Sequence, residues 1–183
     1  SARLFESASD APRTTVRGHS EYKVKETQRE SAIIGLGANL GLAHATFDWA
    51  IKRLRAKASV EAVSPYFYSL PAPAKGGQDA DFVRRQSVFL NAAVLLSTSL
   101  EAEELLQAMQ ALEVEAGRSS KDRSGPRSLD LDLLFYGSRI SACDTCQLPH
   151  PEVHQRSFAM VPAAMVAPHF IDPVTGRPLA ELA

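Results

Sequence analysis

The 183-residue sequence predicts an α+β fold, in which helices pack on a mostly antiparallel sheet. Three observations predict it: strand-like segments outnumber helical ones, the segments follow the order β-α-β-β-α-β-β-α, and turn residues between strands favour hairpins. Hydrophobic residues make up 45% of the chain and charged residues 22%, which is typical of a globular domain with a real hydrophobic core.

The first part of the chain differs from the rest. Residues 1–30 mix Arg, Lys, Glu, Ser and Thr without a sustained apolar period, so we expect a disordered or linker arm there. The arm is too acidic for a typical transit peptide and has no apolar secretion segment. We expect a single domain over residues 31–183.

The predicted domain begins with "AIIGLG" from Ala32, a short buried strand that ends in glycines, and residues 39–41 are typical of a turn. Residues 43–57 carry apolar side chains at helical spacing and predict an amphipathic helix. Residues 60–70, "VEAVSPYFYSL", are strand-like, and the internal proline indicates an edge strand or a bulge. A long loop follows over residues 71–86, and such loops are more often functional than filler.

The second half of the domain again predicts a strand, a helix and a strand in succession. Residues 88–98, "VFLNAAVLLST", predict a strong strand, and Thr98 with Glu101 predicts a capping box for a helix over about residues 100–116. A polar loop then leads into the strand "LDLDLLFY". We expect a hairpin partner for that strand after Gly137, then the loop "QLPHPEVHQR" and a helix in "FAMVPAAMVA".

Charge and hydropathy exclude some classes of function. The formal net charge is −1, so no overall basic field indicates nucleic-acid binding. No apolar run approaches the roughly 18 residues of a membrane span, so we expect no membrane segment. We expect a cytoplasmic protein, because reduced cysteines suit a cytosol-like compartment.

The two cysteines, Cys143 and Cys146, form a C-D-T-C spacing. A structural zinc site needs four ligands, and the chain has no second close pair of cysteines. A thioredoxin-like motif should open a helix after a strand, whereas this pair falls in a predicted loop. We therefore expect two reduced thiols.

The segment from Ser124 to Leu134, "SGPRSLDLDLL", carries two acids in an apolar strand. Residues i and i+2 of a strand project from the same face, about 7 Å apart, so Asp130 and Asp132 project together while the leucines project to the buried face. Two adjacent carboxylates suit Mg²⁺, which binds one or two carboxylates together with waters and phosphates. A D-x-D pair alone is also compatible with an ordinary solvent-exposed strand face that binds no metal.

Basic residues just before the acids favour the phosphate interpretation. Arg118, Lys121, Arg123 and Arg127 crowd this loop, and arginine binds phosphate oxygens in bidentate fashion. Other phosphate motifs are missing, because the chain has no P-loop and its glycine segment at residues 35–41 departs from the dinucleotide fingerprint. No nucleophile elbow occurs either, so covalent catalysis is not indicated.

At this point the sequence resembles a known family. "GPRSLDLDLLFYG" looks like the signature segment of the 6-hydroxymethyl-7,8-dihydropterin pyrophosphokinases of folate biosynthesis, and the resemblance extends over about residues 32–176. It includes "GLGANLG", "FLNAAVLLSTSL", "EELLQAMQALEVEAGR" and "LPHPEVHQRSFAMVP". The family has a ferredoxin-like α/β sandwich, which agrees with the order of elements above.

The resemblance implies transfer of the β,γ-diphosphate of ATP to the pterin hydroxymethyl oxygen, with release of AMP. It implies two Mg²⁺ ions at Asp130 and Asp132, and catalytic roles for these aspartates together with Arg118 and Arg127. It implies ATP contacts from Gln110, Glu113, Arg118, Lys121, Arg127, Leu133, His150 and Arg156. It implies pterin contacts from Leu70, Pro71, Pro73, Phe89, Asn91 and Phe158.

The chain also departs from the family. Ser124 replaces a frequent tryptophan, Ser120 replaces a frequent basic residue, and their loop is one residue short, so closure over the substrates is expected to differ. Two alternatives stay open: another Mg²⁺-dependent nucleotide phosphotransferase, and a non-catalytic pterin- or nucleotide-binding module. As partners we expect ATP and the pterin, no nucleic acid and no membrane, and we expect a monomer.

Overall fold

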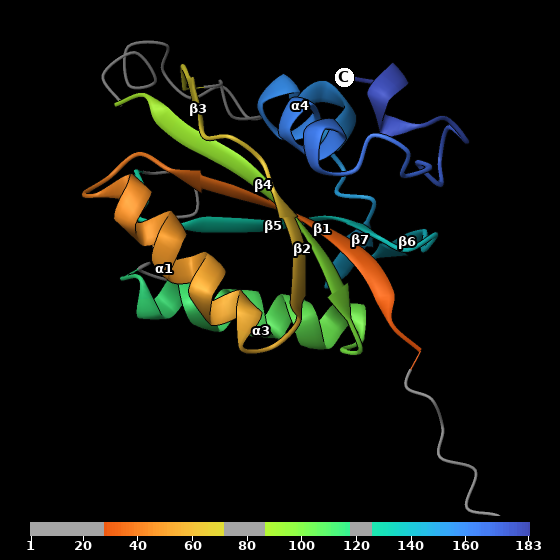
Figure 1. The fold of residues 1–183 in the computed structure, drawn as a ribbon, viewed down its shortest axis with the longest axis horizontal. Coiled ribbons are helices and arrows are strands. Elements are labelled where there is room, and N and C mark those ends of the chain that lie inside the picture. The colour runs from red at the N-terminus through yellow and green to blue at the C-terminus, as the bar shows by residue number, and fades with distance from the viewer. Residues whose placement is uncertain (1–27, 72–86, 118–125) are drawn as a thin grey trace, which may run out of the picture.

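The computed structural model describes residues 28–71, 87–117 and 126–183. Its centre is a five-stranded sheet with the strand order β2-β4-β1-β5, in which β3 pairs beside β2 on β4. Helices α1 and α3 cover one face of this sheet, and α4 covers part of the other (Figure 1). The elements are β1 (Glu30–Ala38), α1 (Ala43–Arg55), β2 (Ser59–Val63), β3 (Phe67–Ser69), β4 (Phe89–Thr98), α3 (Ala102–Glu115), β5 (Asp130–Tyr136), β6 (Ser141–Cys143), β7 (Cys146–Leu148) and α4 (Ser157–Val166).

The strand order confirms the predicted fold class. All the paired neighbours in the large sheet are antiparallel, and β1 and β4 occupy its centre. Two β-α-β units, β1-α1-β2 and β4-α3-β5, interleave to give this order, which is the ferredoxin-like arrangement. In the described part of the chain no helix is long and apolar enough to cross a membrane.

Two clusters of buried side chains stabilise the sandwich. The first lies between the sheet and the α1/α3 layer and is centred on Phe47, Leu54 and Leu112. The second lies under α4 and includes Phe135 and Met160. Burying each large apolar side chain contributes roughly 1.5–3 kcal/mol, so both faces of the sheet are held by apolar packing.

The predicted strand over residues 60–70 is divided in two. Ser64 lies between β2 and β3, where its Oγ accepts a hydrogen bond from the Ala93 N–H at 2.9 Å and its own N–H donates to the Ala93 oxygen at 2.9 Å. The side chain thereby replaces a backbone partner next to Pro65. The proline therefore marks an irregularity in the sheet, as predicted.

The prediction that β5 forms a hairpin with the next strand is wrong. After β5 the chain turns at Gly137, which has φ 48° and donates its N–H to Ser31 of β1 at 2.7 Å. The next strand, β6, then pairs with β7 in a separate two-stranded sheet. Because β5 gains no second partner among the described strands, it lies at the edge of the main sheet.

The predicted capping box of Thr98 and Glu101 is also wrong, because the observed box lies three residues later in the chain. Glu101 is the N-cap of α3, and Glu104 accepts a hydrogen bond from the Glu101 N–H at 2.9 Å to complete a capping box of two glutamates. Thr98 instead accepts from the Leu100 N–H at 3.1 Å, which closes a turn before the helix. The sequence offered both pairs at the required spacing, and the burial of Thr98 at the end of β4 favours the later start.

Candidate active site on the face opposite α1 and α3

The two aspartates of β5 project from the face that α4 partly covers, as their alternation predicts. Leu131 between them belongs to the α1/α3 core, whereas the side chains of Asp130 and Asp132 are 20% and 35% exposed. Opposite them on β1 lie Gly37 and Gly35. A Cβ at Gly35 would lie 3.3 Å from the Leu134 side chain, so the sheet opposite Asp132 is covered. At Gly37 the nearest atom to such a Cβ is the Asp130 Cβ at 3.7 Å, so the sheet beside Asp130 is left open.

Arg127 and Asn39 fix the start of the acidic strand. The Arg127 guanidinium contacts the Asp130 carboxylate at 2.6 Å. The Arg127 N–H donates to Asn39 Oδ1 at 2.8 Å, and the Asn39 N–H donates to the Arg127 oxygen at 3.0 Å. Asn39 is only 8% exposed, so these two bonds form a buried clamp on the arginine backbone.

Sequence reasoning missed Asn39, which was assigned only to a turn. A signal was available, because Asn39 continues the alternation of Gly35 and Gly37 beyond the end of β1. Its carboxamide nitrogen is buried and has no hydrogen-bond partner among the described residues. Such an unsatisfied buried donor is rare in native proteins, and a catalytic or binding role is one of its recognised explanations.

His150 faces the second aspartate. Its Nε2 lies 3.8 Å from Asp132 Oδ1, and its Nδ1 accepts a hydrogen bond from the Glu152 N–H at 3.2 Å. Because Nδ1 is an acceptor, the neutral ring carries its proton on Nε2. The backbone N–H of His150 donates to Leu134 of β5 at 2.9 Å. The imidazole therefore presents a fixed N–H donor beside the acids.

The carboxyl of Asp132 is held in an unfavourable environment for ionisation. Desolvation by the surrounding residues raises its pKa above the ordinary value, and the nearby Asp130 carboxylate raises it further. His150, Arg156 and Arg127 act in the opposite direction without reversing the effect. A cation between the two carboxylates would relieve this repulsion.

The donor set fits a magnesium ion. The described residues contain no group of three or more His, Cys, Asp and Glu side chains that could hold a metal by themselves. Mg²⁺ does not need such a cage, since it binds one or two carboxylates and completes its shell with waters and phosphate oxygens. Asp130 and Asp132 are the residues that would hold it.

Two of the predicted pterin residues, Asn91 and Phe89, lie on the same sheet face as the acids. Asn91 and Asp130 both pair with Gly37, from opposite sides, so about two strand spacings, or roughly 10 Å, separate them across the glycine. The buried Asn91 donates from Nδ2 to Ser69 Oγ at 2.9 Å, which fixes its carboxamide. Phe89 follows the same alternation at the start of β4 and is half-buried.

Helix α4 contributes the second predicted aromatic residue. Phe158 is half-buried in its first turn and packs against the core under α4. The Arg156 guanidinium lies 5.6 Å from the Phe158 ring centroid and forms an ion pair with Glu152. The helix therefore brings one aromatic and one cationic predicted residue together next to the sheet.

Other predicted residues are placed differently. Leu70 is exposed and Pro71 half-buried directly after β3, and Gln110 is exposed on α3. Glu113 is buried on the α3 side, where its Oε1 accepts a hydrogen bond from the Leu131 N–H at 2.8 Å. The side chain of Leu133 belongs to the core, which leaves only its backbone for a ligand. Arg118, Lys121 and Pro73, together with Arg123, Ser120 and Ser124, lie outside the described residues.

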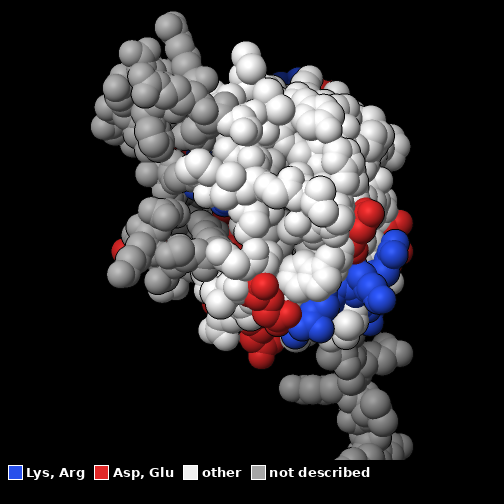
Figure 2. Space-filling model, turned by 90° about the vertical axis from the view of Figure 1, so that its left-hand side faces the viewer, with Lys and Arg blue, Asp and Glu red and all other residues white. Residues whose placement is uncertain are grey.

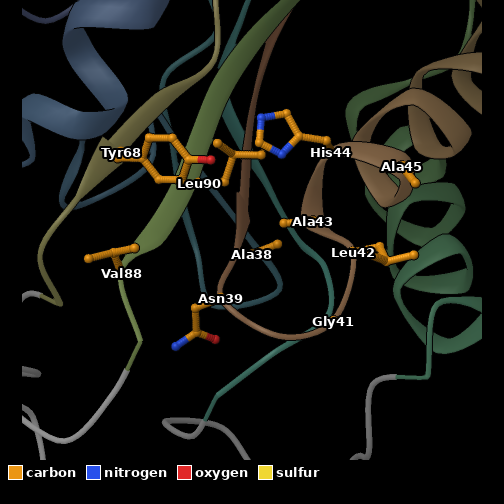
Figure 3. Close-up of a pocket in the computed structure, with 10 residues that line it drawn as sticks. All are labelled: Ala38, Asn39, Gly41, Leu42, Ala43, His44, Ala45, Tyr68, Val88 and Leu90. Carbon is orange, nitrogen blue, oxygen red and sulfur yellow. The ribbon is translucent and has the colours of Figure 1, made fainter.

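A pocket of about 380 Å³ lies on the other side of β4. Figure 3 shows the rings of Tyr68 and His44 on either side of Leu90, with Asn39 and Gly41 at the far end. Leu90 belongs to the α1/α3 core, whereas its neighbour Asn91 points to the opposite face. Among the described residues, the pocket therefore adjoins the predicted site through the backbone of β4 and through Ala38 and Asn39 at the end of β1.

Charged side chains of both signs mix at the surface. Figure 2 shows a broad uncharged area on one face, with Lys, Arg, Asp and Glu gathered along its lower border. An ion pair joins α1 to α3, where the Arg53 guanidinium contacts Glu115 at 2.6 Å. Because both side chains are about half exposed, this pair contributes little to stability.

Fold and site together define an α+β enzyme with a pair of carboxylates on the open face of its sheet. The chain belongs to the 7,8-dihydro-6-hydroxymethylpterin-pyrophosphokinase family, whose sequence profile matches residues 33–168. The family match confirms the pyrophosphokinase membership that the signature segment of the sequence predicts.

Individual relatives agree with this membership. The chain is 36% identical over 157 residues to the 2-amino-4-hydroxy-6-hydroxymethyldihydropteridine pyrophosphokinase of Synechocystis, a match that covers 85% of this chain and 75% of the relative. The enzyme of the same name from Aquifex aeolicus is 31% identical, with 81% and 87% covered. In the mitochondrial folate synthesis bifunctional protein of Pisum sativum, the match at 36% identity covers 75% of this chain and only 25% of the longer protein.

Solved structures agree on the fold. Wild-type HPPK-DHPS of Plasmodium falciparum aligns with a TM-score of 0.64 at 11% sequence identity, covering 85% of this chain and 44% of that one. At this identity the likeness concerns the fold alone, and it supports the ferredoxin-like sandwich described above.

Proposed function

We propose that this chain transfers the β,γ-diphosphate of ATP to the hydroxymethyl oxygen of 6-hydroxymethyl-7,8-dihydropterin, in folate biosynthesis, with release of AMP. The observation that carries the proposal is the open position at Gly37, which pairs with Asp130 on one side and with Asn91 on the other, and Asp132 follows Asp130 on the same strand face. This arrangement offers carboxylates to metal-bound phosphates and a carboxamide to a heterocycle across about two strand spacings.

The acids bind the metal-bound triphosphate in this proposal. Asp130 and Asp132 hold two Mg²⁺ ions, which when bound polarise the phosphate oxygens and offset charge on the leaving AMP. Arg127 is paired with Asp130, so phosphates bound at this acid would lie beside its guanidinium. His150 donates from Nε2, whose proton is fixed by the Glu152 bond to Nδ1. Arg118 and Lys121 add positive charge from the preceding loop.

The remaining predicted ATP contacts come from three places. Arg156 stands at the start of α4, and Gln110 and Glu113 lie on α3. Glu113 acts by holding the Leu131 backbone, and hence the spacing of the two acids, because its carboxylate accepts that N–H. The edge position of β5 leaves backbone groups of Leu133 for the nucleotide.

The pterin ring binds between aromatic faces in this proposal. Phe89 and Phe158 stack on the flat heterocycle, and Asn91 hydrogen-bonds its donor and acceptor edge. The backbone from Leu70 to Pro73 completes the edge contacts. Binding both substrates on one rigid sheet face brings the hydroxymethyl oxygen to the β-phosphate, so catalysis arises from positioning and electrostatics.

Product analysis tests the proposal. The chain is incubated with ATP, Mg²⁺ and 6-hydroxymethyl-7,8-dihydropterin, and the nucleotide products are separated. We expect AMP and the pterin diphosphate in equal amounts, and no product after chelation of Mg²⁺. ADP instead of AMP would indicate another nucleotide phosphotransferase, and binding of both substrates without turnover would indicate a non-catalytic module.

A further inference from the structure

The β6–β7 hairpin places the two cysteines of the chain directly opposite each other. Cys143 and Cys146 are register partners on either side of a two-residue turn, and both thiols are free. Directly opposed residues of a hydrogen-bonded antiparallel pair have Cα atoms about 5.5 Å apart, within the range of about 4.4–6.8 Å that disulfides span. The sequence prediction of a loop is wrong here, and the hairpin brings the thiols within reach of one bond.

The two thiols have different environments. Cys143 is exposed, and its Sγ lies 3.1 Å from the Thr145 hydroxyl oxygen. This hydrogen bond lowers the pKa of the Cys143 thiol, whereas burial raises the pKa of Cys146, which is 3% exposed and packs in the α1/α3 core. Because the thiolate is the reactive form, Cys143 is the nucleophile and Cys146 the second, protected thiol.

We propose that Cys143 and Cys146 form a dithiol–disulfide site that reacts with small disulfides such as glutathione disulfide. The Cys143 thiolate attacks one sulfur of glutathione disulfide and releases one glutathione thiolate. Cys146 then gives up its proton to water, and its sulfur attacks Cys143 in the mixed disulfide and releases the second glutathione. Two protein thiols are oxidised, and one glutathione disulfide is reduced to two thiols.

Closure of this bond changes the end of the hairpin. Opposed Cβ atoms lie about 4.5–5.5 Å apart, which is roughly 1 Å more than a disulfide spans. The turn therefore tightens, and Cys146 moves out of its packing in the core. β7 continues through Leu148 and Pro149 to His150, whose N–H is bound to Leu134 of β5. The oxidation state of the pair is thus connected to the imidazole that faces Asp132.

Metal binding fits the pair less well. A structural zinc site uses four ligands, and among the described residues no group of three or more His, Cys, Asp and Glu side chains could hold a metal. The two thiols alone leave half of a tetrahedral set empty. Thiol–disulfide exchange needs only the two sulfurs that the hairpin supplies.

Intact mass spectrometry of the reduced full chain, treated with excess glutathione disulfide and quenched with acid, tests the proposal. We expect the wild-type chain to lose two hydrogen atoms and to retain no glutathione. C146S should accumulate one glutathione, because no second thiol resolves the mixed disulfide. C143S should stay unmodified over the same time, because Cys146 is buried. Glutathione retained on the wild-type chain, a disulfide-linked dimer, or C143S modified as fast as C146S would each overturn the proposal.

A second readout concerns the connection to His150 and rests on the proposed function. The oxidised wild-type chain should show a several-fold loss of AMP formation that dithiothreitol reverses, while C143S should be insensitive to glutathione disulfide. Unchanged activity of the fully oxidised chain would overturn the connection to His150. If the reduced chain forms no AMP at all, the proposed function fails, and the mass measurement still decides whether the disulfide forms.

Discussion

The side chain of Asp132 lies next to a second carboxylate and is partly removed from water, and both conditions disfavour its ionised form. Two like charges on adjacent same-face positions of a strand destabilise the folded state unless a cation joins them. The residue is therefore better explained by ligand binding than by stability. Function at the expense of stability is common at enzyme sites.

This conflict predicts a pH-dependent gain in stability from Asp132→Asn. Because the pKa of the folded-state carboxyl is raised above its ordinary value of 3.8, ionisation destabilises the folded state as pH rises from about 4. Without Mg²⁺, the variant should therefore have a higher free energy of unfolding than the wild type at pH 7, and the difference should vanish below about pH 4. Urea unfolding in EDTA at several pH values measures it. A variant less stable than wild type at pH 7 would contradict this interpretation.

Asn39 provides a second prediction at the residue scale. Asn39→Ala removes the acceptor of the Arg127 N–H, so the free energy of unfolding should fall by about 1–2 kcal/mol, and AMP formation should fall because Arg127 loses its fixed backbone. Thr46→Ala is a suitable control, since its exposed hydroxyl donates only to Leu42 in the first turn of α1. Equal unfolding energies for the two variants would show that Asn39 does not clamp the arginine.

At the scale of elements, the alternation of acidic and leucine residues along β5 was the most informative pattern in the sequence, because it predicted which face of the strand is buried. Period-two spacing of acids and leucines predicted the open face, and the burial of Leu129, Leu131 and Leu133 confirms it. The hairpin partner and the capping box were wrong because local signals allowed two solutions. Gly137 permitted a hairpin but its N–H bonds to β1, and both Thr98 and Glu101 had an acidic residue three positions later.

The site was less predictable than the elements. The clamp by Asn39 and the orientation of His150 depend on backbone groups of residues distant in sequence, namely Arg127 and Leu134. No single-sequence pattern reports such contacts. The phenylalanines and Asn91 were obtained by resemblance, because apolar strand and helix positions fit core packing equally well.

The junction of α3 and β5 gives a prediction at the element scale. Glu113→Ala leaves the buried N–H of Leu131 without its acceptor, so the free energy of unfolding should fall by about 1–3 kcal/mol. Glu115→Ala on the same helix removes only a half-exposed ion pair with Arg53 and should change it by less than about 0.5–1 kcal/mol. Chemical denaturation of both variants measures the difference. Equal effects would mean that Glu113 does not hold the strand between the two acids.

At the scale of the whole molecule, the large α1/α3 core lies on one face of the sheet and the candidate active site lies on the other. Helices α1 and α3 bury one face of the sheet, whereas α4 covers only part of the other (Figure 1). The row from Asn91 through Gly37 to Asp130 lies on that second face. Two substrates bound along this row would lie on one rigid surface. We therefore expect both halves of the reaction to take place on the face opposite α1 and α3.

The most direct test measures AMP formation by Asp130→Asn and Asp132→Asn, with saturating ATP and pterin over a range of Mg²⁺ concentrations. Asp144→Asn, in the exposed turn of the β6–β7 hairpin, is the matched control for loss of one carboxylate. We expect a loss of about 10²-fold or more in AMP formation for each strand variant, with a raised requirement for Mg²⁺, and wild-type activity for the control. Wild-type AMP formation by either strand variant would contradict the claim that this acid pair is the centre of the active site.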